Sequence, residues 1–340
     1  MNPIDRRTFL AAAGASAAVP FTAVPQEIAG VWTPRTPLPW AVQEIYCAVL
    51  AGRIVTAGGL RLGAENSLVI EDRVGIYDPT ADVWSEGARL LSPRHHPMVM
   101  ANARDLFVFG GYARSPAGEW TNMTEGWRLV DGQWRAVAPL PVPQAEAVGV
   151  AVGDDLHLIT GRTPGSANGG WNDQIDTAEH RIYRAGVDVW ETARPCPMAR
   201  NSAAAAVLDG AIWVAGGRTV SGGGTGQLDR YDVADDRWDT LAPIPRSEAA
   251  NNQVGGGLAM AAANGKLIAF GGEWFQRGGG GVFAETWIYD PAADRWEAGP
   301  PMRTPRHGLA AAAVNDVIYA IAGGEVVSGG RAGGVVEAFA

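Results

Sequence analysis

Short apolar runs alternate with turn signals along most of the chain, and this pattern predicts β-strands. Residues 54–56 and 317–319 are rich in β-branched side chains and are typical of buried strands. Alanine-rich runs at 203–207 and 309–314 would suit helices by intrinsic preference. We interpret them as strands too, because turn signals such as Asp209-Gly210 separate them from the next strand at hairpin spacing.

Two markers recur at a common interval and predict a tandem repeat. The first marker is a glycine pair that closes an apolar run, and the second is a tryptophan further along the chain. The glycine pairs are Gly58-Gly59, Gly110-Gly111, Gly216-Gly217, Gly271-Gly272 and Gly323-Gly324, with Gly161-Arg162 as a degraded copy. The tryptophans are Trp32, Trp84, Trp134, Trp190, Trp238 and Trp296. An interval of about 50 residues is typical of repeats that build β-propellers.

Each unit resembles a kelch repeat, in which an aromatic residue, a turn and a tryptophan follow the glycine pair. Tyr77 to Trp84 reads Tyr-Asp-Pro-Thr-Ala-Asp-Val-Trp, and Tyr289 to Trp296 nearly repeats it. The resemblance implies an all-β fold, a six-bladed kelch β-propeller in which each blade is a four-stranded antiparallel sheet. The propeller is expected to occupy residues 27–340.

The ends of the repeat array predict how the ring closes. The last unit has its glycine pair but no tryptophan, whereas Trp32 has no unit of its own. We therefore expect residues 30–36 to form the outer strand of the last blade. In that arrangement the ring is closed by the N-terminal strand, and deleting residues up to Thr36 should lower stability.

The first 26 residues are interpreted as a cleaved leader. Arg6-Arg7 precedes a mildly apolar stretch at 9–19, which is too short to span a membrane. The segment resembles a twin-arginine export signal, so a periplasmic or secreted protein without a stable membrane anchor is expected. Twin-arginine export carries folded proteins, with or without a cofactor. The route alone therefore does not show that a cofactor is bound.

Charge and cysteine content narrow the function classes. The 340 residues carry a formal net charge of −9 and contain no block of Lys and Arg, which argues against nucleic-acid binding. The two cysteines, Cys47 and Cys196, fall in blades 1 and 4, and we expect them to stay unpaired. A monomer is expected.

Candidate site residues follow from the kelch resemblance. Ligands of kelch propellers usually lie at one mouth of the central channel, which is lined by residues after the glycine pair and residues before the innermost strand. At these positions the sequence has candidate ligand-binding residues Glu44, Arg94, His96, Arg162, Arg200, Arg218, Trp274 and Arg306, and candidate catalytic residues Glu273 and His307. Arginine suits carboxylates and phosphates, and tryptophan offers an apolar face to a sugar ring.

A structural role for the recurring arginines stays open at this point. Arginine precedes the innermost strand four times, as Arg94, Arg200, Arg246 and Arg306. Recurrence in a repeat fits a structural contact, such as a hydrogen bond to loop carbonyls of the next blade. Candidates that break the repeat make the stronger case for function, and these are Glu44, His96, Glu273 and His307.

The favoured function is the binding of a small polar, anionic or carbohydrate ligand, or of a partner's loop, at the channel mouth. The alternative is an isomerase similar to sialic acid mutarotases, which needs a general acid–base and a cation to hold the sugar carboxylate. Glu273 or Glu44 would be the acid–base, His307 a proton relay, and the cation one of Arg200, Arg277 and Arg306. Whether the protein is an enzyme at all is left open.

Metal chemistry is less favoured. The propeller has a distant resemblance to the central domain of galactose oxidase, but His95-His96 stands where that family has a Tyr-His pair, and no further domain follows residue 340 in the sequence. The spacing of Asn172, Asp176 and His180 is similar to an iron site of nitrile-specifier kelch proteins, with Asn in place of Glu. We expect neither a metal nor a cofactor.

Overall fold

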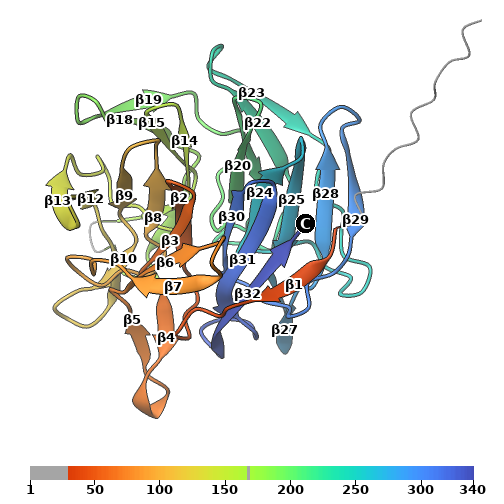
Figure 1. The fold of residues 1–340 in the computed structure, drawn as a ribbon, viewed down its shortest axis with the longest axis horizontal. Helices are drawn as coiled ribbons and strands as arrows, with labels where there is room; N and C mark the ends of the chain where they lie inside the picture. The colour runs from red at the N-terminus through yellow and green to blue at the C-terminus, as the bar shows by residue number, and fades with distance from the viewer. Residues whose placement is uncertain (1–29, 167–168) are drawn as a thin grey trace, which may run out of the picture.

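Four-stranded antiparallel sheets repeat around a central axis in the computed structural model, which describes residues 30–166 and 169–340 (Figure 1). Six such sheets are formed, and the predicted six-bladed propeller is confirmed. The expected export leader at residues 1–26 lies outside the described residues. Within the described ranges, no helix is long and apolar enough to cross a membrane.

The innermost strand of each blade packs against the innermost strands of its two neighbours, and together they line the channel. From the axis outwards, blade 1 consists of β2 (Tyr46–Leu50), β3 (Arg53–Ala57), β6 (Val74–Asp78) and β7 (Val83–Glu86), and blade 2 of β8 (Met98–Ala101), β9 (Leu106–Phe109), β12 (Gly126–Val130) and β13 (Gln133–Val137). Blade 3 consists of β14 (Val148–Val152), β15 (Asp155–Ile159), β18 (His180–Arg184) and β19 (Val189–Ala193), and blade 4 of β20 (Ala204–Leu208), β21 (Ala211–Ala215), β22 (Leu228–Asp232) and β23 (Arg237–Leu241). Blade 5 consists of β24 (Leu258–Ala263), β25 (Lys266–Gly271), β28 (Thr286–Asp290) and β29 (Arg295–Gly299), and blade 6 of β30 (Ala310–Val314), β31 (Val317–Gly324), β32 (Ala332–Phe339) and β1 (Trp32–Arg35).

Four small hairpins extend the loops between the second and third strands of blades 1, 2, 3 and 5. They are β4 (Leu60–Leu62) with β5 (Leu68–Ile70), β10 (Tyr112–Arg114) with β11 (Trp120–Asn122), β16 (Arg162–Pro164) with β17 (Gln174–Asp176), and β26 (Glu273–Gln276) with β27 (Gly279–Val282). A 3-10 turn, η1 (Ala64–Asn66), joins β4 to β5. The side of the propeller that carries these hairpins is called the hairpin face below.

Each glycine pair lets the next blade's loop approach the backbone. Gly271 and Gly272 have φ of 67° and 103°, and Gly272 N donates to Arg306 O of the next blade at 3.0 Å. A Cβ on Gly271 would lie 2.6 Å from that same carbonyl oxygen, so a larger residue would push the blades apart.

The predicted register of this motif was wrong by one residue in blades 3 and 6. There the two left-handed residues are Thr160-Gly161 and Ala322-Gly323, with φ of 60° and 103°, and of 57° and 106°. The first position of the motif therefore tolerates a side chain, whereas glycine is kept at the second position in all six blades.

The tyrosine, aspartate and tryptophan of blades 1, 3, 4 and 5 tie neighbouring blades together. In blade 5, Tyr289 donates to Asp294 Oδ1 at 2.6 Å, and the same oxygen accepts the backbone N–H of Ala242 from the preceding segment. Trp296 Nε1 donates to Ala242 O at 2.8 Å. Equivalent indole bonds run from Trp84 to Thr36, Trp134 to Ala88, Trp190 to Ala138 and Trp238 to Arg194.

Strand β1 closes the ring, as the sequence predicted. It pairs antiparallel with β32, with Trp32 opposite Phe339 and Arg35 opposite Val336, and Figure 1 shows the two strands side by side. Trp32 Nε1 donates to Pro300 O at 3.1 Å, which completes the series of indole bonds between blades. The cysteines are unpaired, with Cys47 half-buried and Cys196 buried.

Two histidines form a buried pair inside blade 3. His157 on β15 and His180 on β18 approach to 2.8 Å between Nδ1 and Nε2. Burial lowers the pKa of His157 to about 4. Burial, with the neighbouring charge of His157, lowers the pKa of His180 to about 3. The pair is therefore neutral in the folded protein at neutral pH.

Acidification is expected to weaken the fold through this pair. In the unfolded chain both rings have a pKa of about 6.5, so below that pH the unfolded state binds more protons than the folded state. Stability should be fully present above pH of about 6.5 and fall as the pH drops towards about 4. Urea titrations across this range should show a steeper loss for the wild type than for the His157→Gln/His180→Gln variant. Equal pH slopes for the two proteins would contradict the assignment.

Candidate functional site

An arc of backbone hydrogen bonds joins the blades around the channel on the hairpin face, linking successive blades from blade 3 through blades 4, 5, 6 and 1 to blade 2. It is formed by one residue per blade, just before the innermost strand, and all six residues have φ between 51° and 71°. These are Glu44, His96, Glu146, Ser202, Gly257 and Gly308, called the ring residues below. The bonds run from His96 N to Glu44 O, Ser202 N to Glu146 O, Gly257 N to Ser202 O, Gly308 N to Gly257 O and Ile45 N to Gly308 O, at 2.8–3.3 Å.

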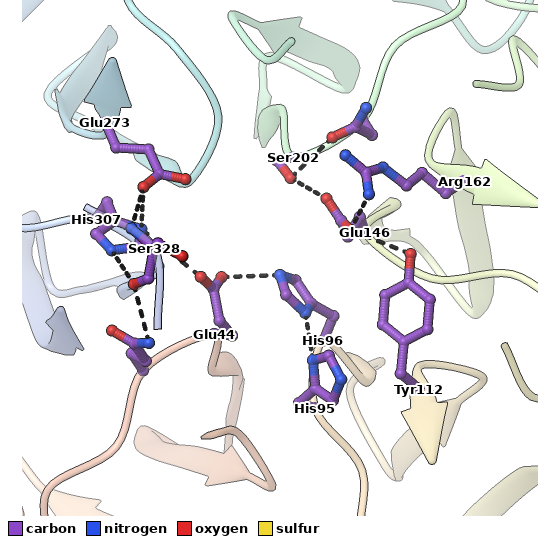
Figure 2. A network of polar contacts seen from close by, with 12 residues as sticks. Glu44, His95, His96, Tyr112, Glu146, Arg162, Ser202, Glu273, His307 and Ser328 are labelled. Atoms are coloured by element: carbon purple, nitrogen blue, oxygen red, sulfur yellow. Dashed lines mark hydrogen bonds and ion pairs between the residues drawn. The ribbon is translucent and has the colours of Figure 1, made fainter. Parts of the chain in front are cut away.

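The ring residues of blades 1 and 2 form an ion pair over the channel. Glu44 Oε2 lies 2.8 Å from His96 Nε2, and His96 Nδ1 lies 2.8 Å from His95 Nδ1 (Figure 2). Burial and the charge of His96 hold the pKa of His95 well below its usual range. His95 is therefore the neutral acceptor, and His96 donates from both of its nitrogens.

The ring residue of blade 3, Glu146, is fully buried and surrounded by donors. Tyr112 donates its hydroxyl to Oε1 at 3.1 Å, and Arg162 Nη1 lies 3.3 Å from the same oxygen. Ser202 donates to Oε2, and Arg218 Nη2 lies 3.6 Å away. The four donors come from blades 2, 3 and 4, so this carboxylate joins three blades.

A third carboxylate, Glu273, enters from the hairpin of blade 5. Its Oε1 accepts from Arg218 Nη1 at 2.6 Å, and its Oε2 accepts from Ser328 N at 2.8 Å. His307 Nδ1 lies 3.5 Å from Glu273 Oε2 and 3.6 Å from Glu44 Oε1. Because His307 Nε2 faces the carbonyls of Val326 and Ser328, at 2.9 and 3.1 Å, Nε2 must carry a proton.

These groups make up the axial cluster, defined here as Glu44, His95, His96, Tyr112, Glu146, Arg162, Ser202, Arg218, Glu273 and His307. Burial alone would raise the pKa of Glu44, but the charge and hydrogen bond of His96 hold it well below the usual range. Burial likewise opposes ionisation of Glu146, yet the positive charges, Arg162 first, lower its pKa to about 2. Burial alone would lower the pKa of His96, but the negative charge and hydrogen bond of Glu44 raise it. The cluster is therefore strongly ionic at neutral pH.

Several polar atoms of the cluster have no hydrogen-bond partner among the described residues. They include His95 Nε2, Arg162 Nε and His307 Nδ1. A cavity of about 30 Å³ lies beside the cluster, lined by Glu44, His96 and Ser202 together with the glycines of blades 5 and 6. Across residues 30–166 and 169–340, no group of three or more His, Cys, Asp or Glu side chains is arranged to hold a metal ion.

Six of the ten predicted site residues meet in the axial cluster. They are Glu44, His96, Arg162, Arg218, Glu273 and His307. The structure does not bring Trp274 into it: this indole stands over Gly281 of its own hairpin and packs at the edge of the hydrophobic core between blades 4 and 5. The roles of the six in binding or catalysis stay predictions.

Three predicted arginines lie inside blades instead of lining the channel. Arg94, Arg200 and Arg306 are at most 1% exposed. They pair with acids of their own blades, Arg94 with Glu125, Arg200 with Asp229 and Arg306 with Glu337, at 2.8–3.2 Å. The structural role considered for the recurring arginines fits this geometry. The contacts are made within the arginine's own blade, however, and not to the next blade. Arg246 is not equivalent to them, because it is exposed and donates to Asn251 O.

Blade 3 reverses this internal pair. Gln144 occupies the arginine position, and Arg181 on β18 occupies the position of the acid, with Arg181 Nη1 donating to Gln144 Oε1 at 2.8 Å. The reversal supports a structural role, because the contact is kept while its polarity changes.

Glu146 stands at a position that the sequence places on the channel, but it was not chosen as a candidate site residue. The sequence could have identified it, because Glu146 stands two residues before an innermost strand, as Glu44 and His96 do. Tyr112 follows the glycine pair of blade 2 directly, as Arg218 does in blade 4, and was omitted in the same way.

Comparisons with known proteins support the repeat assignment. The model of the kelch motif matches residues 199–245 and 255–303, which cover blades 4 and 5. The chain is 26% identical to Kelch-like protein terF of Aspergillus terreus over 64% of this chain and 48% of that protein. It is 30% identical to Kelch-like protein 34 of Homo sapiens over 58% of this chain and 29% of that protein. The chain thus spans about half, or less, of the length of these relatives.

A solved structure supports the fold. The structure of YjhT superposes with a TM-score of 0.74 at 16% sequence identity, covering 88% of this chain and 95% of that one. At this identity the likeness shows the fold alone. The chain therefore carries kelch repeats on a six-bladed propeller, a common scaffold for binding ligands or partners.

Proposed function

We propose that this propeller binds a small sugar acid, or a similar polyhydroxylated anion, at the axial cluster. The observation that carries the proposal is the convergence of three carboxylates with two guanidinium groups and three imidazoles at one end of the channel. Guanidinium groups recognise a ligand carboxylate, and carboxylates accept hydrogen bonds from hydroxyl groups. A sugar acid presents both kinds of group.

The cluster differs from the structural ion pairs of the blades in two respects. The pairs of Arg94, Arg200 and Arg306 repeat from blade to blade, whereas cluster residues break the repeat. Its buried atoms without a hydrogen-bond partner among the described residues, such as His95 Nε2 and Arg162 Nε, are costly in a purely structural network. Both features support a ligand-binding role.

Access to the cluster is through its most exposed cation. The side chain of Arg218 is 20% exposed, whereas that of Glu273 is 3% exposed. The cavity of about 30 Å³ is too small for a sugar ring, so the ligand binds over the cluster and competes with Glu273 and Glu146 for Arg218. The leader expected at residues 1–26 would place this site outside the cytoplasm.

Ligand titrations test the proposal. Glucuronate, galacturonate and sialic acid are compared with glucose and phosphate in thermal-shift and calorimetric measurements. A sugar acid at a hundred times its Kd should add about 2.7 kcal/mol to the free energy of unfolding. Arg218→Met should weaken binding roughly 10- to 100-fold, because a charged hydrogen bond is lost.

The control is Arg237→Met on the outer strand β23, where Arg237 is 56% exposed and pairs with Asp239. It should bind as the wild type does. Arg218→Lys keeps the charge and should lose less affinity than Arg218→Met. No shift with any sugar acid, or equal affinity for Arg218→Met and wild type, would refute the proposal.

The second candidate is an isomerase acting on the same ligand class. The observation that favours it is the approach of His307 Nδ1 to Glu273 Oε2, a carboxylate–imidazole pair suited to acid–base chemistry. Anomer exchange followed by NMR decides between the two functions. In an enzyme, Glu273→Gln should abolish exchange and leave binding largely intact, whereas exchange at the rate of buffer alone in the wild type leaves binding as the function.

A further inference from the structure

The hairpins of blades 1, 2 and 3 enclose a groove beside the axial cluster. An open groove of about 600 Å³ lies there. Its lining includes Leu68, Arg114, Glu119, Trp120, Trp171 and Asp173. The volume is within the range of about 300–1,000 Å³ that is typical of ligand sites.

Two tryptophans form a corner in this groove. The rings of Trp120 and Trp171 lie 5.1 Å apart between centroids at an angle of 90°. Trp171 is 38% exposed and lines the groove. Perpendicular aromatic faces of this kind can hold two adjacent sugar rings, one against each face.

Residues of the axial cluster contact both indoles. Trp171 stacks over the guanidinium of Arg162 at 5.2 Å and meets Tyr112 edge-on at 5.4 Å. Trp120 packs against His95 with centroids 4.4 Å apart. Rings supported in this way lose little conformational freedom on binding, which favours affinity.

Polar groups surround the aromatic corner. The guanidinium of Arg114 donates to the carbonyls of Gly118 and Leu68, at 2.8 and 2.7 Å, which fix it at the groove. Among the described residues it forms no ion pair with a carboxylate. Glu119 and Asp173 add two carboxylates, and Ser166 donates to Asp173. Two carboxylates against one guanidinium disfavour a polyanion and suit a neutral chain rich in hydroxyl groups.

We propose that this groove binds a neutral oligosaccharide, with its sugar rings on Trp120 and Trp171 and its hydroxyl groups on Arg114, Glu119 and Asp173. The site is separate from the axial cluster that takes the sugar acid, so the inference goes beyond the proposed function. The contact between Trp171 and Arg162 places the two sites next to one another.

Binding of defined neutral hexasaccharides to the full chain tests this site. Cellohexaose, maltohexaose, xylohexaose, mannohexaose and chitohexaose are titrated by calorimetry, with quenching of tryptophan fluorescence as the second readout. At least one hexasaccharide should bind, and more tightly than its own monosaccharide. Trp171→Ala should weaken that binding roughly tenfold or more, because a central aromatic contact is lost.

Two controls separate the outcomes. Phe275→Ala removes a 53% exposed aromatic side chain on another hairpin, and its hexasaccharide binding should be unchanged. Arg218→Met should keep hexasaccharide binding while losing the sugar acid, so failure of one site is distinguishable from failure of the other. Glu119 is exposed, so Glu119→Gln should fold even if Trp171→Ala does not. Its hexasaccharide affinity, expected to be lower than that of the wild type, then tests the groove.

Three results would overturn the proposal. They are the absence of binding by all five hexasaccharides, equal affinity of wild type, Trp171→Ala and Glu119→Gln, and selective binding of a proline-rich peptide in the groove in place of any hexasaccharide.

Discussion

Trp32→Ala should lower the free energy of unfolding by about 3–5 kcal/mol, the cost of removing a large buried aromatic side chain. Trp32 is 2% exposed although it lies only two residues into the described chain. Its ring packs against Phe270 and Phe339, with centroids 4.9 and 5.1 Å away. Its Nε1 also donates to Thr286 Oγ1 at 3.0 Å in blade 5.

The effect is large because one side chain joins two blades. Strand β1 belongs to blade 6, yet the contacts of Trp32 with Phe270 and Thr286 reach blade 5. Deleting residues up to Thr36 would remove these contacts and leave β32 as an unpaired edge. Urea unfolding followed by fluorescence and circular dichroism measures both changes.

Conservative and exposed substitutions serve as controls for Trp32. Trp32→Phe keeps most of the buried area and should cost less than Trp32→Ala. Val31→Ala alters a neighbour that is 59% exposed and should change stability by less than about 0.5 kcal/mol. An unfolding midpoint for Trp32→Ala equal to that of Val31→Ala would show that β1 does not close the ring.

Arg306→Ala is the second substitution with a large expected effect, a loss of about 3–5 kcal/mol. The guanidinium is 1% exposed and binds Glu337 at 2.8 Å. It also donates to the carbonyls of Thr304, Ala320 and Ala322, at 2.8–3.1 Å. Truncation leaves the carboxylate of Glu337 buried without its counter-charge, and this accounts for most of the cost.

The double variant Arg306→Met/Glu337→Met separates the cost of an unpaired charge from the value of the pair. Without the buried carboxylate, much of the lost stability should return in thermal unfolding. The double variant should also bind sugar acids as the wild type does, because Arg306 does not reach the axial cluster. Lost binding in a stably folded double variant would restore Arg306 as a ligand residue.

The fold was predictable because its signals repeat. The tyrosine, aspartate and tryptophan that stand at fixed intervals in the sequence are the residues that bond one blade to the next. The same regularity assigns Trp32 to the last blade from the sequence alone. The register errors at Thr160 and Ala322 arose because one glycine of each pair is dispensable.

The site was harder to predict because three consecutive residues before each innermost strand point in different directions. In blade 2, Arg94 enters the blade, His95 meets Tyr112, and His96 faces Glu44 across the channel. The left-handed backbone at His96, with φ of 51°, produces this divergence. Sequence pattern does not reveal such a turn where the residue is not glycine, so the separate directions of Arg94, His95 and His96 could not be predicted.

The groove was missed for a different reason. Trp171 lies in the Gly-, Ser- and Asn-rich loop at 163–176, a composition typical of solvated surface segments. Its partner Trp120 comes from the corresponding loop of blade 2. The sequence does show a large aromatic residue in the same loop of two adjacent blades. This pattern predicts an aromatic groove only if the two loops are known to lie in contact.

The arc of backbone bonds at the ring residues has a consequence for hydrogen exchange. Each of the amide protons of Ile45, His96, Ser202, Gly257 and Gly308 is held by a carbonyl of an adjacent blade. Fraying of an outer strand leaves these bonds intact, so exchange at these amides requires neighbouring blades to separate. Each of these five protons therefore reports on the separation of one pair of neighbouring blades, whereas amides of the outer strands report on single blades.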